Sequence, residues 1–288
     1  MSVERILSSR VHDVGGFAVR RALPSREKRA VGPFVFWDHM GPVALDPGEG
    51  MDVRPHPHIG LATVTYLFDG EIIHKDSLGS DQAILPGEIN WMTAGRGIVH
   101  SERSSANARR IGARVHGIQS WIALPASDEE AEPGFHHHAA EALPAVEMPG
   151  ARVRVLAGSA YGASSPVRVF SPTLYVEAHL DAGAEIAPPP DVEERAAYVV
   201  TGSVSCADER AEAGQMVVFL PGADARLLAN SGAHVMLLGG AALDGPRHVW
   251  WNFVSSSRER IERAKREWKD RRFPNVPGDE TEFIPLPE

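Results

Sequence analysis

The sequence predicts an all-β protein of sandwich or barrel type, with one helix near the C-terminus. Two observations support this class. Runs rich in β-branched and aromatic residues recur along the chain, and turns containing glycine and proline separate them. Many short strands bounded by turns are typical of β-sandwiches and barrels. The length of 288 residues is enough for one large domain or two of medium size.

The expected strands fall into two groups along the chain. The first group comprises the runs at residues 17–23, 62–68, 71–77 and 112–124. The second comprises the runs at 151–160, 172–180, 195–207, 215–222 and 225–243. TYLFDGEII followed by LPGEINWMTAG in the first group resembles AYVVTGSVS followed by AGQMVVFLPG in the second. This weak repeat favours a duplicated β-barrel.

A polar segment separates the two groups. The stretch PASDEEAEPGFHHHAAEALPAVEMPG is acidic, flanked by proline and without strand periodicity, which indicates an inter-domain connection. We therefore expect a first domain over residues 1–130, a linker over 131–150 and a second domain over 151–288. The consecutive histidines His136, His137 and His138 fall in this linker, where we expect an exposed loop.

The segment 255–273, SSSRERIERAKREWKDRRF, predicts the one helix, which we place in the second domain. Ser256 or Ser257 is a suitable N-cap, and basic residues late in the run suit the C-terminal end of the helix dipole. Its apolar residues are Ile261, Ala264 and Trp268. We expect this helix to pack over a barrel face.

The composition excludes several classes of function. With 29 basic and 38 acidic residues the net charge is −9, which argues against direct binding to nucleic acid or to an anionic membrane. The sequence contains no apolar run of membrane-spanning length and no N-terminal signal pattern. Cys206 is the only cysteine, which favours a reduced, cytoplasmic setting. Any metal must therefore be held by nitrogen and oxygen ligands.

Two short segments carry residues of metal-ligand type. In RPHPHIGLATVTYLFDGE, His56 and His58 are two residues apart, and a β-strand directs such residues to one face. In WMTAGRGIVHSE, His100 and Glu102 repeat this spacing. Three imidazoles and one carboxylate form a suitable site for a divalent first-row metal, with coordination positions left open for substrate.

The same segments resemble the two motifs of the cupins and, more closely, the pirin family. FVFWDHMGPV, HPHIGLATVTYLFDGEIIHKDSLGS, PGEINWMTAGRGIVHSE and NFVSSSRERIERAKREW occur in pirin-like order over most of residues 1–272. The resemblance implies a bicupin, in which two antiparallel β-barrel (jelly-roll) domains are followed by the C-terminal helix. It also implies one metal in the N-terminal barrel, most often Fe(II), with Zn, Mn, Ni, Co or Cu as the other candidates.

Carried over by motif, the metal ligands are His56, His58, His100 and Glu102. Pirin-like proteins include members with quercetin 2,3-dioxygenase activity and others that act as transcriptional co-regulators. The resemblance therefore implies a small aromatic, flavonol-like substrate and O2 if the protein is an enzyme. The alternative is a non-catalytic metal- or redox-sensing regulator that binds a protein partner. Glu102 is the candidate catalytic residue, either as a fourth ligand or as a general base.

One position departs from the family pattern. Many cupins and pirins have a glutamate four or five residues after the second histidine, where this chain has Ala62 and Thr63. By strand parity we expect Ala62 to face the same way as His58. Residues of the same parity, namely Val64, Tyr66 and Phe68, are then either a hydrophobic wall for a planar ligand or ordinary core.

The remaining histidines and the cysteine have simpler interpretations. We expect His234 and His248 to be isolated, so that the second barrel binds no metal. His74 is a core or surface residue, or else lines the pocket. For His39 the resemblance favours the pocket mouth, and the alternative is a turn. Cys206 lacks a cationic setting that would lower its thiol pKa, so we expect a small strand residue.

Overall fold

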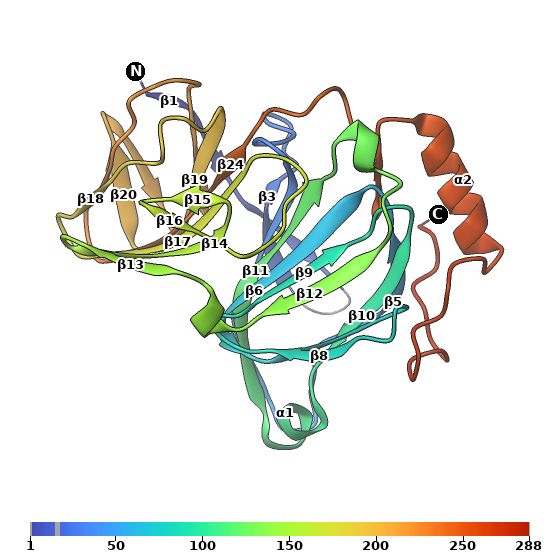
Figure 1. The fold of residues 1–288 in the computed structure, drawn as a ribbon. Coiled ribbons are helices and arrows are strands. Elements are labelled where there is room, and N and C mark those ends of the chain that lie inside the picture. Colours follow the sequence, from blue (N-terminus) through green and yellow to red (C-terminus); the bar gives the residue numbers. More distant parts are fainter. Residues whose placement is uncertain (1, 15–17, 288) are drawn as a thin grey trace. The chain divides into compact units, whose positions relative to one another are not determined.

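The structure of this chain is a computed structural model that describes residues 2–14 and 18–287 (Figure 1). The chain forms two compact units, each made of three segments. Unit 1 comprises Met1–Val11, Arg20–His39 and Glu141–Leu243. Unit 2 comprises His12–Val19, Met40–Ala140 and Asp244–Glu288. The contiguous domain boundaries at residues 130 and 150 stay a prediction, since these units are interleaved in the sequence.

Unit 1 is a sandwich of a larger and a smaller antiparallel sheet. The larger has the order β1 (Val3–Ser8), β22 (Gln215–Phe219), β19 (Glu194–Thr201), β24 (Ala233–Gly240), β17 (Thr173–Leu180), β14 (Ala151–Ala157) and β13 (Ala145–Met148). The smaller has the order β18 (Glu185–Ile186), β23 (Leu227–Ala229), β20 (Ser203–Cys206) and β21 (Glu209–Glu212). A short hairpin joins β15 (Ser159–Ala160) to β16 (Ala163–Ser164).

The core of unit 1 follows from strand alternation. Alternate residues of β17 and β24, including Val176, Ala178 and Val235, pack with residues of the smaller sheet such as Val204. Because side chains on a strand alternate between faces, the intervening residues project from the other side of the larger sheet. Cys206 lies in this core, which confirms it as a small buried strand residue.

Unit 2 has the same two-sheet plan. Its larger sheet has the order β12 (Gly134–His138), β9 (Ile89–Thr93), β6 (Leu61–Gly70), β11 (Ala113–Ala123), β4 (Phe34–Leu45), β3 (Ala18–Leu23) and β2 (Arg10–Asp13). The division between the units falls within β2, β3 and β4. The smaller sheet has the order β5 (Asp52–His58), β10 (Ile98–Arg103), β7 (Ile72–Asp76) and β8 (Asp81–Ile84). Residue 17, expected to begin the first strand run, lies outside the described residues.

The remaining elements are short, apart from the C-terminal helix. They are α1 (Ala106–Ile111), the 3-10 turns at Ala126–Asp128 and Ala140–Ala142, the paired strands β25 (His248–Trp250) and β26 (Phe253–Ser255), and α2 (Arg258–Lys269). None of the helices in the described part of the chain combines the length and the apolar character needed to cross a bilayer.

Helix α2 confirms the helix expected from the sequence. Ser257 is its N-cap, and the Ser257 hydroxyl accepts a hydrogen bond from the backbone N–H of Arg260. The expected apolar stripe packs against Ile59, Val99 and Phe253 of unit 2. Helix α2 thus packs on one side of the segments that end at Ile59 and contain Val99. The paired histidines lie on the other side of these segments.

The segment expected as a linker contains two strands. In residues 131–150, β12 pairs with β9 and β13 pairs with β14. The exposed loop expected for the consecutive histidines is therefore wrong. His137 faces Asn90 across the β12–β9 pair, and their side chains are 2.8 Å apart at His137 Nδ1 and Asn90 Oδ1. Cross-strand pairing orders this polar segment although its own sequence lacks strand periodicity.

Candidate metal centre

The two sequence segments that carry paired ligands lie side by side in unit 2. Strands β5 and β10 are antiparallel neighbours, and His100 is directly opposite His56. The ring centroid of His56 is 5.0 Å from that of His58 and 4.4 Å from that of His100. The nitrogen ligand atoms of these three buried histidines all lie within 4.8 Å of one another.

Glu102 belongs to an overlapping group that includes a residue of the neighbouring strand β7. A register shift separates His100 from Glu102 in the pairing with β5, and in the pairing with β7 Glu102 is opposite His74. The ligand atoms of His74, His100 and Glu102 also lie within 4.8 Å of one another. His100 is therefore shared by both groups, and His74 is a buried neighbour whose place the sequence left open.

The hydrogen bonds of His56 and His58 direct their Nε2 atoms toward the cluster. Nδ1 of His56 is 2.9 Å from the carbonyl oxygen of Arg54, and Nδ1 of His58 is 3.1 Å from that of Asn252. A carbonyl only accepts, so each Nδ1 carries the proton and each Nε2 keeps its lone pair. Metal-binding histidines are usually oriented in this way.

His100 has a longer chain of partners. Its Nδ1 is 3.5 Å from Nδ1 of His74, and Nε2 of His74 is 3.1 Å from Oδ2 of Asp76. If Nδ1 of His100 donates a hydrogen bond to Nδ1 of His74, and Nε2 of His74 donates one to Asp76, then Nε2 of His100 carries no hydrogen and is an acceptor. That Nε2 atom is buried and has no hydrogen-bond partner among the described residues. A buried nitrogen without a partner, beside two others that keep their lone pairs, fits a bound metal ion.

The carboxylate of Glu102 is held by two neutral donors. Thr65 Oγ1 donates to Oε1 at 3.2 Å, and Gln119 Nε2 is 3.1 Å from each carboxylate oxygen. Burial raises the pKa of Glu102, while His74 and these hydrogen bonds lower it in part. The net result is a carboxylate that is more basic than an exposed glutamate.

Two aromatic residues lie against the histidines. The ring of Trp121 makes an edge contact with His58, with centroids 5.2 Å apart. The ring of Phe135 is stacked on His74, with centroids 4.3 Å apart. Sequence reasoning missed both residues, because they come from β11 and β12, far from the ligand segments along the chain. They supply an aromatic wall.

Of the two alternatives left open for Val64, Tyr66 and Phe68, a wall for a planar ligand or ordinary core, the structure favours core. Thr65 donates to Glu102, so the alternate residues Val64, Tyr66 and Phe68 project from the opposite face of β6. The parity does not run on from His58 because the chain turns at Gly60, which has a positive φ of 69°.

Ala62 is on that opposite face too, so it does not stand where an acid would reach the cluster. Thr63 shares the face of Thr65 and is paired with Trp121. Having alanine instead of an acid at position 62 therefore does not deprive the cluster of a carboxylate. The residue that occupies the corresponding inward position is a threonine.

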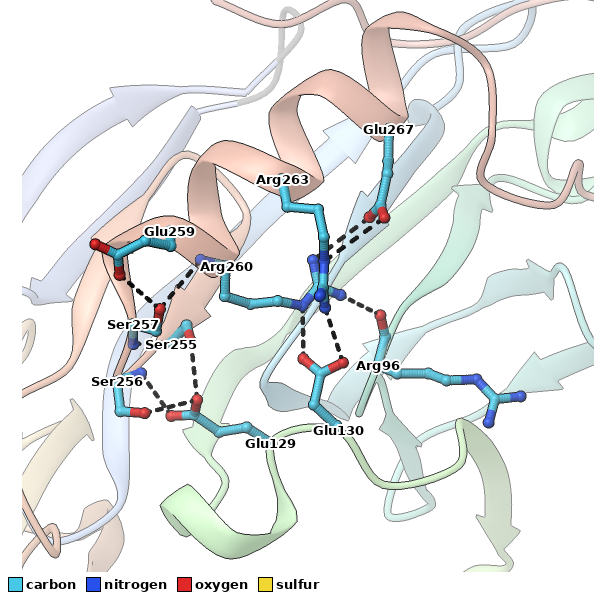
Figure 2. A network of polar contacts seen from close by, with 10 residues as sticks. All are labelled: Arg96, Glu129, Glu130, Ser255, Ser256, Ser257, Glu259, Arg260, Arg263 and Glu267. Carbon is cyan, nitrogen blue, oxygen red and sulfur yellow. Dashed lines mark hydrogen bonds and ion pairs between the residues drawn. The ribbon is translucent and has the colours of Figure 1, made fainter.

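A network of polar contacts holds the segment that supplies the Asn252 carbonyl (Figure 2). Glu129 accepts hydrogen bonds from the Ser255 hydroxyl and from the backbone N–H and hydroxyl of Ser256. Helix α2 adds Arg260, which donates to Glu130 and to the backbone carbonyl of Arg96. The network therefore ties residues 255–260 to the chain at residues 96 and 129–130.

We expect Glu129→Ala to lower the free energy of unfolding by about 3 kcal/mol, because the buried Arg247 loses its buried partner and keeps only the more exposed Asp244. The side chains of Glu129 and Arg247 are 7% and 2% exposed, and their ion-pair distance is 2.9 Å. Denaturant unfolding measures the change. Glu132→Ala is the matched control, since Glu132 pairs with Arg96 at the surface and should change stability by less than about 1 kcal/mol. Equal losses of stability in Glu129→Ala and Glu132→Ala would contradict a stabilising role for the buried pair of Glu129 and Arg247.

The stability of the metal-free protein should depend on pH through its buried histidines. Burial lowers the pKa of His56 from 6.5 to about 4, although its hydrogen bond to Arg54 raises it in part. Burial, followed by the neighbouring histidines, also lowers the pKa of His100. Between pH 6.5 and about 4 the unfolded chain binds a proton that the folded, metal-free protein does not, so stability is lost as the pH falls through this window.

For His56 alone this loss should reach about 3 kcal/mol. Urea unfolding of the metal-stripped protein at several pH values measures it. His56→Gln, whose side chain does not titrate, should show a shallower decrease. The same pH dependence in both proteins would argue against a neutral His56 in the folded state.

The other candidate histidines take different places. His39 lies within β4, not in a turn, and its Nδ1 is 3.0 Å from the hydroxyl oxygen of Tyr198; both residues belong to unit 1. His248 is in none of the ligand clusters found among the described residues. His234 is not isolated, because it lies beside Glu177 and His179.

Comparison with known proteins gives concordant results. The pirin family model matches residues 16–122, and the model of the pirin C-terminal cupin domain matches residues 175–274. A pirin-like protein of Caulobacter vibrioides is 50% identical over 289 aligned residues, covering 99% of this chain and 100% of that protein. A Pseudomonas aeruginosa protein, provisionally named as a quercetin 2,3-dioxygenase, is 37% identical and covers 93% of this chain and 84% of its own length.

Solved structures agree in fold. The crystal structure of quercetin 2,3-dioxygenase from Acinetobacter baumannii has a TM-score of 0.91 at 34% identity, covering 99% of this chain and 95% of that one. Bacterial pirin YhhW from Escherichia coli, solved in complex with nickel(II), has a TM-score of 0.65 at 19% identity and shows the fold alone, over 83% of this chain and 99% of that one. The expected bicupin with a C-terminal helix is confirmed. The chain belongs to the pirin family.

Proposed function

We propose that this protein is a metal-dependent dioxygenase that opens a flavonol-type substrate, such as quercetin, with O2. The observation that carries the proposal is the buried cluster of His56, His58 and His100, in which Nε2 of His100 has no hydrogen-bond partner among the described residues. The likeness to the quercetin 2,3-dioxygenase of Acinetobacter baumannii, at 34% identity over 99% of the chain, supports the reaction class.

In this proposal His56, His58 and His100 would hold the ion through Nε2, and Glu102 would add a carboxylate oxygen. We propose Fe(II), and the same donor set also suits Zn, Mn, Ni, Co or Cu. When bound, the metal supplies Lewis acidity that lowers the pKa of a substrate hydroxyl. The remaining steps depend on residues of this chain.

Glu102 is the proposed catalytic residue. Its raised pKa makes it a suitable acceptor for the proton of an acidic substrate hydroxyl. Gln119 donates to both carboxylate oxygens, which orients the group. A lone pair that binds the metal cannot also accept the substrate proton. The roles of Glu102 as metal ligand and as general base therefore compete.

The aromatic wall of Trp121 and Phe135 is the proposed contact surface for the planar substrate. The ring of Trp121 touches His58 of the cluster, and the ring of Phe135 is stacked on His74 of the overlapping group. Burial of the cluster excludes water from around the reacting groups, which strengthens their electrostatic interactions. The single buried Cys206 and the net charge of −9 are consistent with a cytoplasmic protein that does not bind nucleic acid directly.

The test is incubation of the iron-loaded protein with quercetin in air, following the loss of flavonol absorbance. His56→Ala is the control variant. We expect turnover by the wild-type protein and none by the variant. Retained metal without turnover in the wild-type protein would contradict the enzyme and favour a metal- or redox-sensing protein that acts through a protein partner.

A further inference from the structure

Unit 1 carries a second cluster of metal-ligand side chains, formed by Glu177, His179 and His234. Glu177 and His179 are two residues apart on β17, and His234 on β24 is directly opposite His179. Their neighbours Ala178 and Val235 point into the core of unit 1. The three side chains therefore share the other face of the larger sheet.

The geometry of this cluster is convergent. The two imidazole rings are stacked, with centroids 4.1 Å apart and planes inclined by 19°. Nε2 of His234 is 3.0 Å and Nε2 of His179 is 3.4 Å from the same oxygen, Oε1 of Glu177. Zinc–ligand bonds of about 2.0–2.1 Å at tetrahedral angles place neighbouring donors about 3.3 Å apart. The observed separations match that spacing.

Exposure and charge also suit a cation. The side chain of His179 is 56% exposed, whereas those of Glu177 and His234 are 12% and 10% exposed, so solvent reaches one side of an otherwise covered site. Burial lowers the pKa of His234, and Glu177 raises it in part.

We propose that Glu177, His179 and His234 bind a divalent transition metal of the zinc type, with solvent completing the coordination. Two imidazoles and a carboxylate are common zinc donors, and an open fourth position is typical of sites that are not purely structural. The site shares no residue with the cluster of His56, His58 and His100. It is therefore independent of the proposed dioxygenase function.

The test is equilibrium dialysis of the metal-stripped, full-length protein against Zn2+, with bound zinc measured by mass spectrometry. We expect His179→Ala and Glu177→Gln each to bind one equivalent fewer than the wild-type protein. His56→Ala should lose a different equivalent, so the double variant His56→Ala/His179→Ala should lose two. His248→Ala, which changes a histidine outside both clusters, should bind as much zinc as the wild-type protein.

His179 is exposed and Glu177→Gln keeps the shape of the side chain, so neither variant should disturb folding. Wild-type zinc content in both variants would overturn the proposal. The triad would then be only a hydrogen-bonded pair of histidines sharing one carboxylate. Loss of a zinc equivalent in His179→Ala and Glu177→Gln, but not in His248→Ala, supports the site whether or not the protein oxidises a flavonol.

Discussion

Replacing His100 with alanine is expected to abolish metal retention by the cluster in unit 2 and, because the metal supplies the Lewis acidity, to abolish flavonol turnover as well. His100 is the residue common to both ligand groups, the one with His56 and His58 and the one with His74 and Glu102. Its removal leaves neither group complete. Metal content after dialysis and the rate of flavonol loss measure the two effects.

Stability provides an independent readout of the same substitution. In the metal-free wild-type protein the buried Nε2 of His100 finds no partner within residues 2–14 and 18–287, and an unsatisfied buried nitrogen destabilises the fold by about 1–3 kcal/mol. A bound metal should remove this deficit and raise the Tm, because a ligand at 100 times its Kd stabilises by about 2.7 kcal/mol. The rise in Tm with metal should therefore be smaller in His100→Ala, in which only the separate group of Glu177, His179 and His234 is left to bind the ion.

His248→Ala is the matched control, and it should retain metal, turnover and the metal-dependent rise in Tm. A His100→Ala protein that keeps the full metal content of the wild-type protein and wild-type turnover would refute the proposed ligand set. Turnover without metal in either protein would refute the proposed mechanism.

Glu102→Gln is expected to reduce turnover by about 100- to 10,000-fold, the range typical for the loss of a general base. The substitution preserves shape but removes the negative charge. It also places an amide NH2 against Gln119, which donates to both carboxylate oxygens in the wild-type protein. Steady-state rates and metal content together distinguish the two roles of this residue.

If Glu102 is mainly a base, the variant should keep its metal on three histidines and lose turnover. If it is mainly a ligand, metal affinity and turnover should fall together. Thr65→Val is the matched control, since it removes one hydrogen bond to Glu102 and keeps the carboxylate. We expect Thr65→Val to change turnover less than about 10-fold. Wild-type turnover in Glu102→Gln would exclude both roles.

Local patterns in the sequence predicted the elements that depend on near neighbours. The spacing of His56 and His58 follows from the alternation of a strand, and the structure places both rings in one cluster. The apolar stripe and serine cap of α2 follow from helical periodicity, and both are observed. These features depend on only a few consecutive residues.

Prediction failed where the chain changes direction. Strand parity carried from His58 to Ala62 assumed one continuous strand, but the chain turns at Gly60, where a side chain would meet the Val254 carbonyl at 2.0 Å. The face of β6 that meets Glu102 therefore carries Thr65. A turn that shifts the alternation by one residue moves every side chain that follows it to the opposite face.

The sequence by itself determined the all-β class, the C-terminal helix and the two short segments that carry paired donors. Only the tertiary structure decided which donors meet, because strand register is set by contacts between distant segments. Pairing of β7 with β10 brought His74 beside Glu102, and pairing of β17 with β24 brought His179 beside His234. No local pattern around these histidines encodes that register, since each partner lies dozens of residues away along the chain.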